Sequence, residues 1–183
     1  MPSQGRRERA REERRRLIVQ TARELAEAEG WEAVTTRRLA EKVDYSQPVL
    51  YSHFPNMTAI TTAVALEGVE ELTVALGEAE GLREVAAAYL RFAEEHPALY
   101  EAMFVRRTDL SFGSDETPAA LIAAFGEIRQ AVEPFARDGV DVETLTEVFW
   151  SALHGQATLN HTARLRPDHL QARADILVTL LTT

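Results

Sequence analysis

The chain contains no cysteine among its 183 residues. This absence excludes a disulfide framework, a thiolate metal site and a cysteine nucleophile. No apolar run approaches the roughly 20 residues that cross a bilayer, and the N-terminus lacks the apolar segment of a signal peptide. We therefore expect a soluble, cytoplasmic protein. Hydrophobic residues make up 45% of the chain, which is enough to build a core and argues against global disorder.

Positive charge is scarce overall but concentrated at the N-terminus. The net charge is -9, yet residues 1–60 carry 11 Lys and Arg against 9 Asp and Glu, whereas residues 61–183 carry 9 against 20. Residues 6–16 alone hold seven arginines and three glutamates. Because affinity for DNA depends on local rather than whole-chain charge, this asymmetry suits a basic DNA-reading domain on an acidic body. A solvated, charged helix end is the alternative.

Strand patterns are also missing, and helical periodicity dominates. Apolar residues recur at helical spacing from Leu17 to Ala26, and Gly30 ends that pattern. The sequence thus predicts an all-α fold of about nine helices. Residues 1–60 are expected to form a three-helix DNA-binding domain with an arginine-rich N-terminal arm, and residues 61–183 a helical effector-binding and dimerisation domain. Beyond the first helix, we expect helices at 37–43, 46–55, 56–80, 82–96, 97–105, 118–136, 141–165 and 167–183, with an exposed loop at 106–118.

Two short helices joined by a tight turn are predicted between residues 34 and 60. Thr35 or Thr36 can cap the first of them through its hydroxyl. Asp44 tolerates the left-handed geometry of the turn, and Ser46 can cap the second helix. Such a pair is the helix-turn-helix unit, whose second helix can enter the major groove of DNA. The pattern therefore predicts a protein that reads DNA sequence.

The residues from Leu17 to about Ile60 resemble the TetR family of bacterial transcriptional regulators. The resemblance is carried by the TTRRLA start of the second helix, the SQPVLYSHFPN segment and the entry to a long fourth helix. Beyond residue 60 it is mostly architectural, although residues 150–155 are similar to a Trp–His–Gly signature of one branch of the family. The resemblance implies a ligand-responsive transcriptional regulator. We expect a repressor that a small molecule releases from a palindromic operator.

The resemblance assigns the third helix to the major groove of double-stranded DNA. Gln47 can pair with adenine, and Val49 can touch a thymine methyl group. Tyr51 and His53 are expected at phosphates, where they fix the register, and the two residues that open the second helix are expected there as well. The predicted DNA contacts are Thr36, Arg37, Tyr45, Ser46, Gln47, Pro48, Val49, Tyr51 and His53, together with Arg7 and Arg11 from the arm.

Three residues depart from the family's pattern and weaken the expected grip on DNA. Met57 stands where family members often carry a lysine that holds phosphate, and the absence of that cation should lower the salt slope by about one unit. Asp44 replaces the usual turn glycine, and Ser52 replaces a longer polar or basic side chain. The arginine-rich arm can compensate through phosphate or minor-groove contacts.

Aromatic residues are concentrated in the C-terminal helices, as in pockets for small molecules. The resemblance implies an effector pocket there, and ordinary core packing is the alternative for each single aromatic. Polar side chains on the 141–165 helix need partners if they are buried, so His154 is expected with Trp150 at the pocket, or else as a structural histidine. The predicted pocket comprises Tyr89, Phe92, Met103, Phe104, Phe125, Trp150 and His154.

The last helix carries a row of apolar residues at steps of four, three and four positions, a spacing suited to packing against another helix. The row consists of Leu170, Ala174, Leu177 and Leu181. In the family the last two helices form a four-helix dimer interface, so the resemblance implies a homodimer and a palindromic operator. Packing inside one protomer is the alternative. The predicted interface comprises Leu159, Leu170, Ala174, Leu177 and Leu181.

An enzyme is one alternative class. Two pairs of adjacent glutamates, at 70–71 and 94–95, are candidates for acid–base catalysis, but adjacent helical positions diverge by about 100°. His154 and His161 lie two helical turns apart, about 10 Å, which is too far to share a metal ion. No catalytic residue, metal or cofactor is therefore expected.

A further alternative is an interaction module of the same fold with weakened or lost DNA binding. It is raised by Met57, by Asp44 and by the net acidity of the chain. Binding to duplex DNA would separate it from the regulator.

Overall fold

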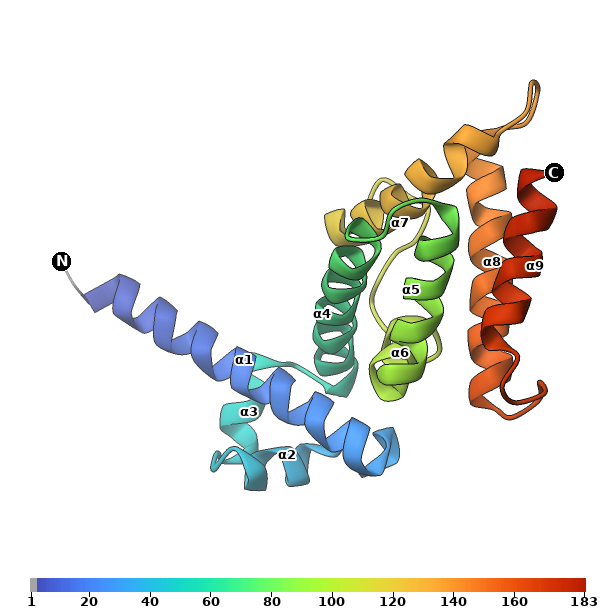
Figure 1. The fold of residues 1–183 in the computed structure, drawn as a ribbon. Helices are drawn as coiled ribbons and strands as arrows, with labels where there is room; N and C mark the ends of the chain where they lie inside the picture. The colour runs from blue at the N-terminus through green and yellow to red at the C-terminus, as the bar shows by residue number, and fades with distance from the viewer. Residues whose placement is uncertain (1–2) are drawn as a thin grey trace. The chain divides into compact units, whose positions relative to one another are not determined.

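The computed structural model describes residues 3–183, and this part of the chain contains nine α-helices, two short 3-10 helices and no strand (Figure 1). The prediction of an all-α fold with about nine helices is confirmed. The α-helices are α1 (Ser3–Glu29), α2 (Thr36–Lys42), α3 (Gln47–His53), α4 (Met57–Gly77), α5 (Leu82–Glu95), α6 (Pro97–Phe104), α7 (Ala119–Val132), α8 (Val142–His161) and α9 (Leu170–Thr182), and the 3-10 helices are η1 (Trp31–Ala33) and η2 (Glu133–Phe135).

The helices form two compact units. The head unit comprises the chain up to Gly68 together with Ala98–Leu110, and the body unit comprises Val69–Pro97 and Ser111–Thr183. The head unit therefore contains α1, α2, α3, most of α4 and α6. This division differs from a boundary at residue 60, because α6 is packed with the N-terminal helices rather than with its neighbours in sequence.

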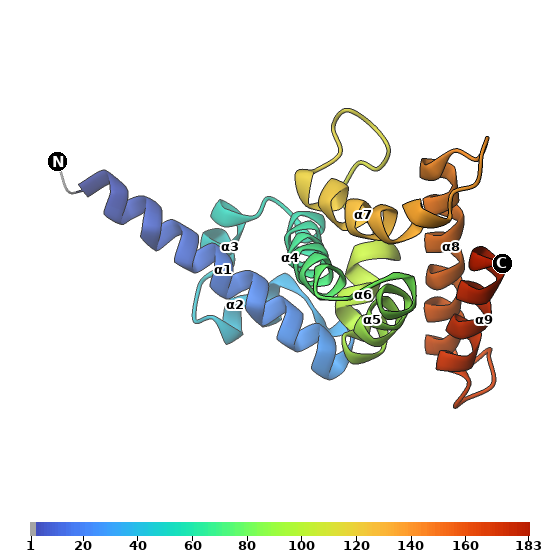
Figure 2. The ribbon, with the colours of Figure 1, turned by 45° about the horizontal axis from the view of Figure 1, so that its top comes forward.

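The head unit is built around the apolar face of α1, which lies across α2 and α3 (Figures 1 and 2). Ile18 of α1, Leu39 of α2 and Leu50 of α3 have no exposed surface, and Phe54 is 1% exposed. Within α1 the buried residues Ile18, Ala22 and Leu25 recur at helical spacing, so this helix turns one apolar stripe inward. The core fixes the angle at which α3 is held against α1.

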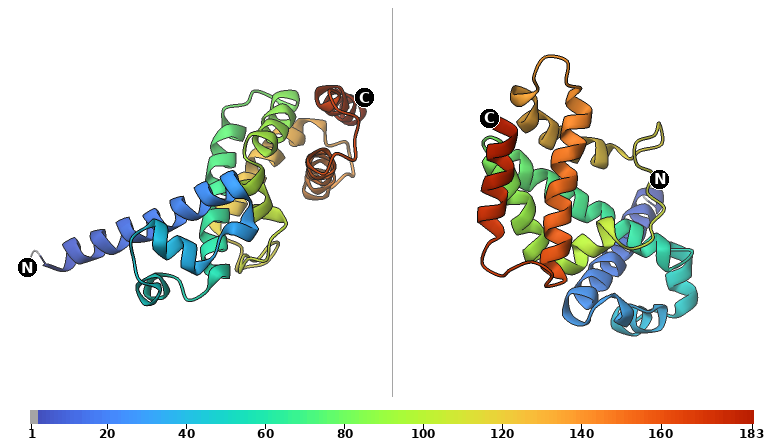
Figure 3. Two further views of the ribbon diagram at one scale, coloured as in Figure 1. Left: turned by 90° about the horizontal axis from the view of Figure 1, so that it is seen from below. Right: turned by 90° about the vertical axis from the view of Figure 1, so that its right-hand side faces the viewer.

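The arginine-rich N-terminal arm is helical and continuous with the first helix. Residues 3–16 form the first turns of α1, and the ribbon of α1 continues well past α3 (Figures 1 and 3). Between Gly5 and Gly30 the sequence contains no glycine or proline and is rich in Arg, Glu and Ala, which favour helix. The helix therefore has no residue at which to end before Gly30, where φ is 82°.

Contacts from α1 and η1 hold α6 in the head unit. The Glu27 carboxylate accepts hydrogen bonds from the backbone N–H groups of Ala98 and Leu99, at 3.2 and 3.0 Å. The indole N–H of Trp31 donates to the Ala98 carbonyl at 2.7 Å. The first-turn amides of a helix have no partner within it, so Glu27 supplies the acceptor that α6 lacks. The guanidinium group of Arg106 also lies 5.4 Å from the centre of the Trp31 ring.

A glycine permits the close approach of α4 and α6 in this unit. A Cβ atom at Gly68 would lie 2.7 Å from the sulfur of Met103 and 2.8 Å from the side chain of Leu99. Both neighbours are buried. The two helices could not pack this closely with a larger residue at position 68.

The body unit consists mainly of α5, α7, α8 and α9. The last two helices run side by side, with α5 against them (Figures 1 and 3). Its core includes Tyr89, Phe149 and Leu153, none of which has exposed surface. An ion pair between Arg83 and Asp175 joins α5 to α9.

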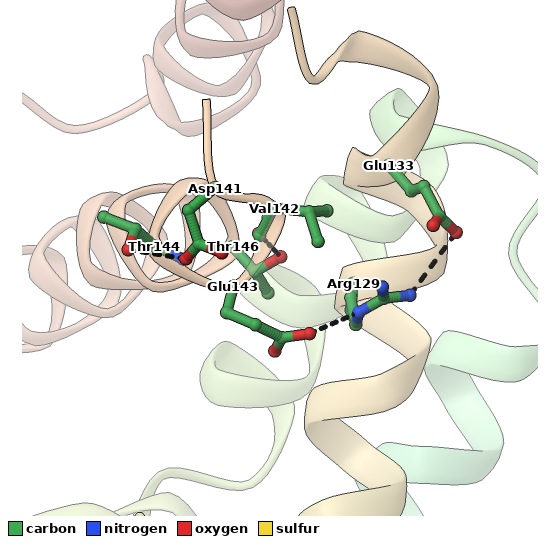
Figure 4. A network of polar contacts seen from close by, with 7 residues as sticks. All are labelled: Arg129, Glu133, Asp141, Val142, Glu143, Thr144 and Thr146. Atoms are coloured by element: carbon green, nitrogen blue, oxygen red, sulfur yellow. Dashed lines mark hydrogen bonds and ion pairs between the residues drawn. The ribbon is translucent and has the colours of Figure 1, made fainter. Parts of the chain in front are cut away.

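A polar network joins the end of α7 to the start of α8 (Figure 4). The Nε of Arg129 donates to Glu143 at 2.6 Å, and its Nη1 lies 3.4 Å from a carboxylate oxygen of Glu133. Asp141 caps α8 by accepting two bonds of 2.8 Å from Thr144, one from its backbone N–H and one from its hydroxyl. These bonds lower the pKa of Asp141, because they favour the charged carboxylate.

Several helix ends differ from the predicted ranges. The fourth helix ends at Gly77 rather than near residue 80. The eighth ends at His161 rather than residue 165, and the chain beyond it turns through left-handed Ala163 and Asp168, at φ values of 53° and 61°. Apolar periodicity alone does not locate such turns, since neither residue is a glycine.

Candidate nucleic-acid interface

The helix-turn-helix geometry follows from local chemistry between residues 35 and 54. The Thr35 hydroxyl caps α2 by accepting from the Arg38 N–H at 3.3 Å. Asp44 adopts φ of 56° in the turn, as predicted, and the next residue, Tyr45, donates its N–H to the Ala40 carbonyl at 2.9 Å. Ser46 occupies the N-cap position of α3, although its side chain makes no capping bond. The two helices are thereby joined by a turn of four residues.

The outer surface of α3 presents most of the predicted base-reading residues. Ser46, Gln47 and Pro48 are exposed, and Val49 and Tyr51 are 39% and 47% exposed although both are large and hydrophobic. Exposed apolar side chains on a short helix, beside a polar amide, match the needs of a surface that meets base edges. Tyr45 in the turn is half-buried.

The start of α2 offers a second set of candidate contacts. Thr36 is half-buried and Arg37 is exposed. The Nε of Arg37 donates to Glu41 at 2.9 Å, but a pair this exposed is worth little and leaves the remaining donors available to phosphate. Both predicted residues therefore lie where a helix N-terminus also favours an anion.

Arg38 has a different role, which the sequence did not indicate. Its two Nη atoms donate to the two carboxylate oxygens of Glu29, at 2.9 and 2.8 Å. The bond to Arg38 lowers the pKa of Glu29. This bidentate pair links the end of α1 to α2, so Arg38 helps to hold α2 against α1.

His53 is placed differently from the other predicted phosphate contacts. Its side chain is only 8% exposed, at the end of α3. Burial lowers its pKa, and the charges of Arg11, Arg14 and Arg15 lower it further. A nearly buried imidazole presents little surface to a phosphate oxygen, so in this structure His53 is a packing residue of the head. The predicted phosphate contact would require its side chain to move outward.

Two of the departures from the family's pattern lie at the end of α3 and the start of α4. The Ser52 hydroxyl donates back to the Val49 carbonyl at 2.6 Å, so it is occupied within α3. Asn56 caps α4 by accepting from the Ala59 N–H at 2.8 Å. Met57, the first residue of α4, is half-buried.

The predicted pocket residues fall into both units. Tyr89, Phe92, Phe125, Trp150 and His154 belong to the body unit, whereas the two residues from α6 belong to the head unit. Within the body, the indole N–H of Trp150 donates to the Tyr89 hydroxyl at 3.0 Å, and the Trp150 and His154 rings lie 6.2 Å apart. Burial lowers the pKa of His154. Tyr89, Trp150 and His154 thus form an aromatic cluster that carries polar atoms. The α6 residues are Met103, which is buried, and Phe104, which is half-buried.

A small cavity lies elsewhere in the body unit. Its volume is about 150 Å³, and it is bounded by α5, α8 and the start of α9. None of the seven predicted pocket residues is among its lining, although Leu170 of the predicted dimer interface is. Asn160, which lines it, accepts a bond of 3.1 Å from Arg173. The lining residues are Leu90, Ala93, Glu94, Pro97, Ala157, Asn160, His161 and Leu170.

The predicted dimer residues divide between the surface and the protomer's own core. Leu159 is 39% exposed, and Leu170, Leu177 and Leu181 are half-exposed, but Ala174 is only 1% exposed. Ala174 therefore packs inside the protomer. The solvent-facing apolar side chains of α8 and α9 are instead Val148, Leu159, Ile176 and Leu180, of which the last two are 60% and 72% exposed.

Two features of the described residues bear on other functions. Between residues 3 and 183, no group of three or more His, Asp or Glu side chains is arranged to hold a metal ion. In the same range, no helix has both the length and the apolar character required to cross a membrane.

Family comparisons match most of the chain. Residues 18–64 match the family described as bacterial regulatory proteins, tetR family, and residues 82–181 match the tetracyclin repressor-like C-terminal domain. A helix-turn-helix-type transcriptional regulator of Mycobacterium tuberculosis is 27% identical over 157 residues, which is 81% of this chain and 70% of the relative. Tetracycline repressor protein class C of Escherichia coli is 47% identical over 51 residues, or 28% of this chain and 23% of the repressor.

Solved structures share the fold over nearly the whole chain. A protein of unknown function from Rhodococcus sp. RHA1 has a TM-score of 0.73 and 23% identity, covering 92% of this chain and 93% of the other. BioQ in complex with its double-stranded DNA operator has a TM-score of 0.68 and 18% identity, covering 92% and 97%. At these identities the likeness concerns the fold alone.

Proposed function

The chain belongs to the TetR family of bacterial regulatory proteins, and we propose that it is a dimeric transcriptional repressor that a small molecule releases from a palindromic operator. DNA-binding regulation of transcription is the activity of this family, and the finer elements of the proposal are the repressor role, the operator symmetry and the effector. We assign operator reading to residues 1–60, and effector binding and dimerisation to residues 61–183.

One observation carries the proposal: α3 packs against the core of the head with one face and exposes its other face to solvent. Leu39 and Leu50 are fully buried under α1, while Gln47, Val49 and Tyr51 face solvent. A short helix supported in this way can enter the major groove without rearrangement. In the proposed complex Gln47 reads adenine, Val49 touches a thymine methyl group and Tyr51 reaches a phosphate.

The proposed dimer rests on the outer surface of α8 and α9. Val148, Leu159, Ile176 and Leu180 expose large apolar side chains on two adjacent helices. Large exposed apolar groups gathered on one face typically mark an interaction surface. Joining two copies through α8 and α9 by a two-fold axis would bury them and give two reading helices, which is why the operator is proposed to be palindromic.

The proposed effector site is the aromatic cluster of the body unit. Tyr89, Trp150 and His154 place a hydroxyl, an indole N–H and an imidazole among apolar neighbours, as small-molecule sites do. A ligand that binds the DNA-incompetent conformation more tightly shifts the population away from the operator. Coupling of about 1–3 kcal/mol would change operator affinity by roughly 5- to 150-fold.

Selection of duplexes from a random pool by the wild-type chain tests the function. A palindromic sequence should be enriched, and binding should weaken steeply with salt. Gln47→Ala should cost about 1–3 kcal/mol and relax the preference at one base pair. Gln20→Ala is the matched control, since Gln20 is an exposed glutamine of the same unit on α1 that bonds to Glu24.

Failure to enrich any duplex would favour the interaction module over the regulator. Equal losses for Gln47→Ala and Gln20→Ala would contradict the assignment of α3 to base reading. We propose no catalytic role for the chain, and turnover of a bound effector would contradict that part of the proposal.

A further inference from the structure

The arginines of the first half of α1 lie on two different faces of the helix. Arg7, Arg11 and Arg14 precede the buried residues Ile18 and Ala22 at steps of four, three, four and four residues, the spacing of one helical face. These three arginines, here called the near row, therefore extend the core-facing stripe of α1 past the head. All three are exposed.

The remaining exposed arginines, Arg6, Arg9 and Arg16, are here called the far row. At about 100° per residue, Arg9 and Arg16 point roughly opposite to the near row, and Arg6 lies about 100° from Arg7. Glu13 stands four residues after Arg9 and three before Arg16, so spacing alone makes it a neighbour of both. The far row is thus partly neutralised, and by the same spacing Glu8 is a neighbour of Arg11 in the near row.

Electrostatics at His53 gives an independent view of the same arrangement. After burial, the groups that lower the pKa of His53 are Arg11, Arg14 and Arg15. Residues of the far row are not among these causes, and neither is Arg7. Arg11 and Arg14 therefore lie near the C-terminal end of α3, and Arg7 continues their row towards the N-terminus of α1.

Arg15 belongs to neither row, because its guanidinium group already contacts residues of the head. Its Nη1 donates to the His53 carbonyl at 2.6 Å, and its guanidinium group lies 4.2 Å from the centre of the Phe54 ring. Carbonyl groups at a helix C-terminus lack partners in the helix and favour a cation, and a cation above an aromatic ring adds further attraction. Arg15 thereby fastens the end of α3 to α1.

We propose that the near row binds the phosphate backbone of DNA beside the groove that α3 enters, and that Arg15 is a positioning residue that sets the angle between α1 and α3. This inference rests on the proposed DNA-reading function. An α-helix with side chains is about 10–12 Å wide, whereas the minor groove is about 6 Å wide. A helical segment therefore tracks phosphates rather than entering the minor groove.

The length of the near row suits such a role. Arg7 and Arg14 are separated by about 10 Å along the helix axis at about 1.5 Å per residue. One DNA strand presents a phosphate about every 3.4 Å of duplex axis. The row therefore spans about three phosphates of one strand.

Two triple variants with the same change in charge test the surface. Near-row Arg7→Gln/Arg11→Gln/Arg14→Gln should lower the salt slope of binding by about one unit for each phosphate that the protein no longer neutralises. Far-row Arg6→Gln/Arg9→Gln/Arg16→Gln should leave the slope within about half a unit of wild type. Both are measured by titrating the full chain, over a series of salt concentrations, with a duplex selected by wild type and with a scrambled duplex of the same length.

Arg15→Gln separates positioning from phosphate binding. We expect it to weaken the selected duplex more than the scrambled one, by roughly five-fold or more, with the salt slope unchanged. The near-row triple should weaken both duplexes alike. Replacing the near row with lysines should restore the slope, and circular dichroism should give the same helicity for every variant.

The outcomes separate this inference from the function on which it rests. If the wild-type chain binds DNA and the two triple variants lose equal amounts of salt slope, the near-row surface is overturned but the proposed function is not. If Arg15→Gln lowers the salt slope of binding by about one unit, Arg15 is a phosphate contact rather than a positioning residue. Wild type that binds no duplex would overturn the proposed function as well.

Discussion

At the residue scale, the head is held together by polar side chains that bond to backbone groups at or near helix ends. Glu27 accepts from the first amides of α6, Arg15 donates to the last carbonyl of α3, and Trp31 donates to Ala98. Each contact joins segments far apart in sequence. Because an unpaired buried group is costly, these side chains determine how the head helices are oriented.

Trp31→Phe tests the most buried of these bonds. Phenylalanine keeps an aromatic ring, but it is smaller than tryptophan and removes the N–H that donates to the Ala98 carbonyl at 2.7 Å. We expect a loss of about 1–3 kcal/mol in the free energy of unfolding, measured with urea. Tyr51→Phe, which removes an exposed hydroxyl, should change it by less than about 0.5 kcal/mol. A Trp31→Phe value equally close to wild type would contradict the prediction.

His53 makes head stability depend on pH. Its pKa is lowered in the folded chain, so the unfolded chain binds the proton more readily. Its contribution is therefore complete above about pH 6.5 and is lost as the pH falls from there towards the folded pKa. Urea unfolding on both sides of pH 6.5 should show a shallower pH dependence for His53→Gln than for wild type. His169→Gln, at an exposed position, should behave as wild type, and an unchanged slope for His53→Gln would refute the assignment.

At the element scale, the turn between α2 and α3 combines backbone strain and a negative charge at one residue. Asp44 holds a left-handed conformation at φ of 56° and is exposed beside the predicted DNA surface. The conformation strains a residue with a side chain, and the carboxylate repels phosphate. Strain and charge thus act on one residue but can be separated by substitution.

Asp44→Gly should relieve both effects. We expect the free energy of unfolding to rise by roughly 0.5–1 kcal/mol and affinity for the selected duplex to increase. Asp44→Asn removes only the charge, so it should raise affinity with little change in stability. Urea unfolding and duplex titration give the two quantities, and weaker binding by both variants would show that the carboxylate serves the complex.

At the scale of the whole molecule, charge and apolar surface are separated along the chain. The arginine-rich turns lie in the head unit, whereas residues 61–183 hold 20 of the 29 acidic residues. The exposed apolar face of α8 and α9 lies in the body unit. This separation allows one molecule to meet DNA with one unit and a second copy with the other.

The pair Ile176→Glu and Leu180→Glu tests the proposed dimer face. Two carboxylates in a dimer interface would be buried without partners, so sedimentation should show a monomer, and binding to the palindromic duplex should weaken. Gln171→Glu, an exposed position on the opposite side of α9, should remain dimeric. A wild-type chain that sediments as a monomer, or a double variant that stays dimeric, would contradict the proposed interface.

The sequence by itself determined the features that depend on neighbouring residues. Thr35 and Asp44 act within four positions of themselves, so the cap of α2 and the turn were predicted correctly, whereas Ser46 makes no capping bond. The apolar periodicity likewise predicted the all-α fold. The uninterrupted helix through residues 3–29 was also readable, since no breaker separates its two halves.

Only the tertiary structure decided the features that depend on distant partners. Arg15, Trp31 and Glu27 meet residues 38, 67 and 72 positions away, and no local pattern encodes those meetings. Burial of His53 and of Ala174 was hidden for the same reason, because a helical face does not say whether it packs within the protomer, against a partner or against DNA. That choice is made by the packing of all nine described helices, where each apolar stripe finds its neighbour.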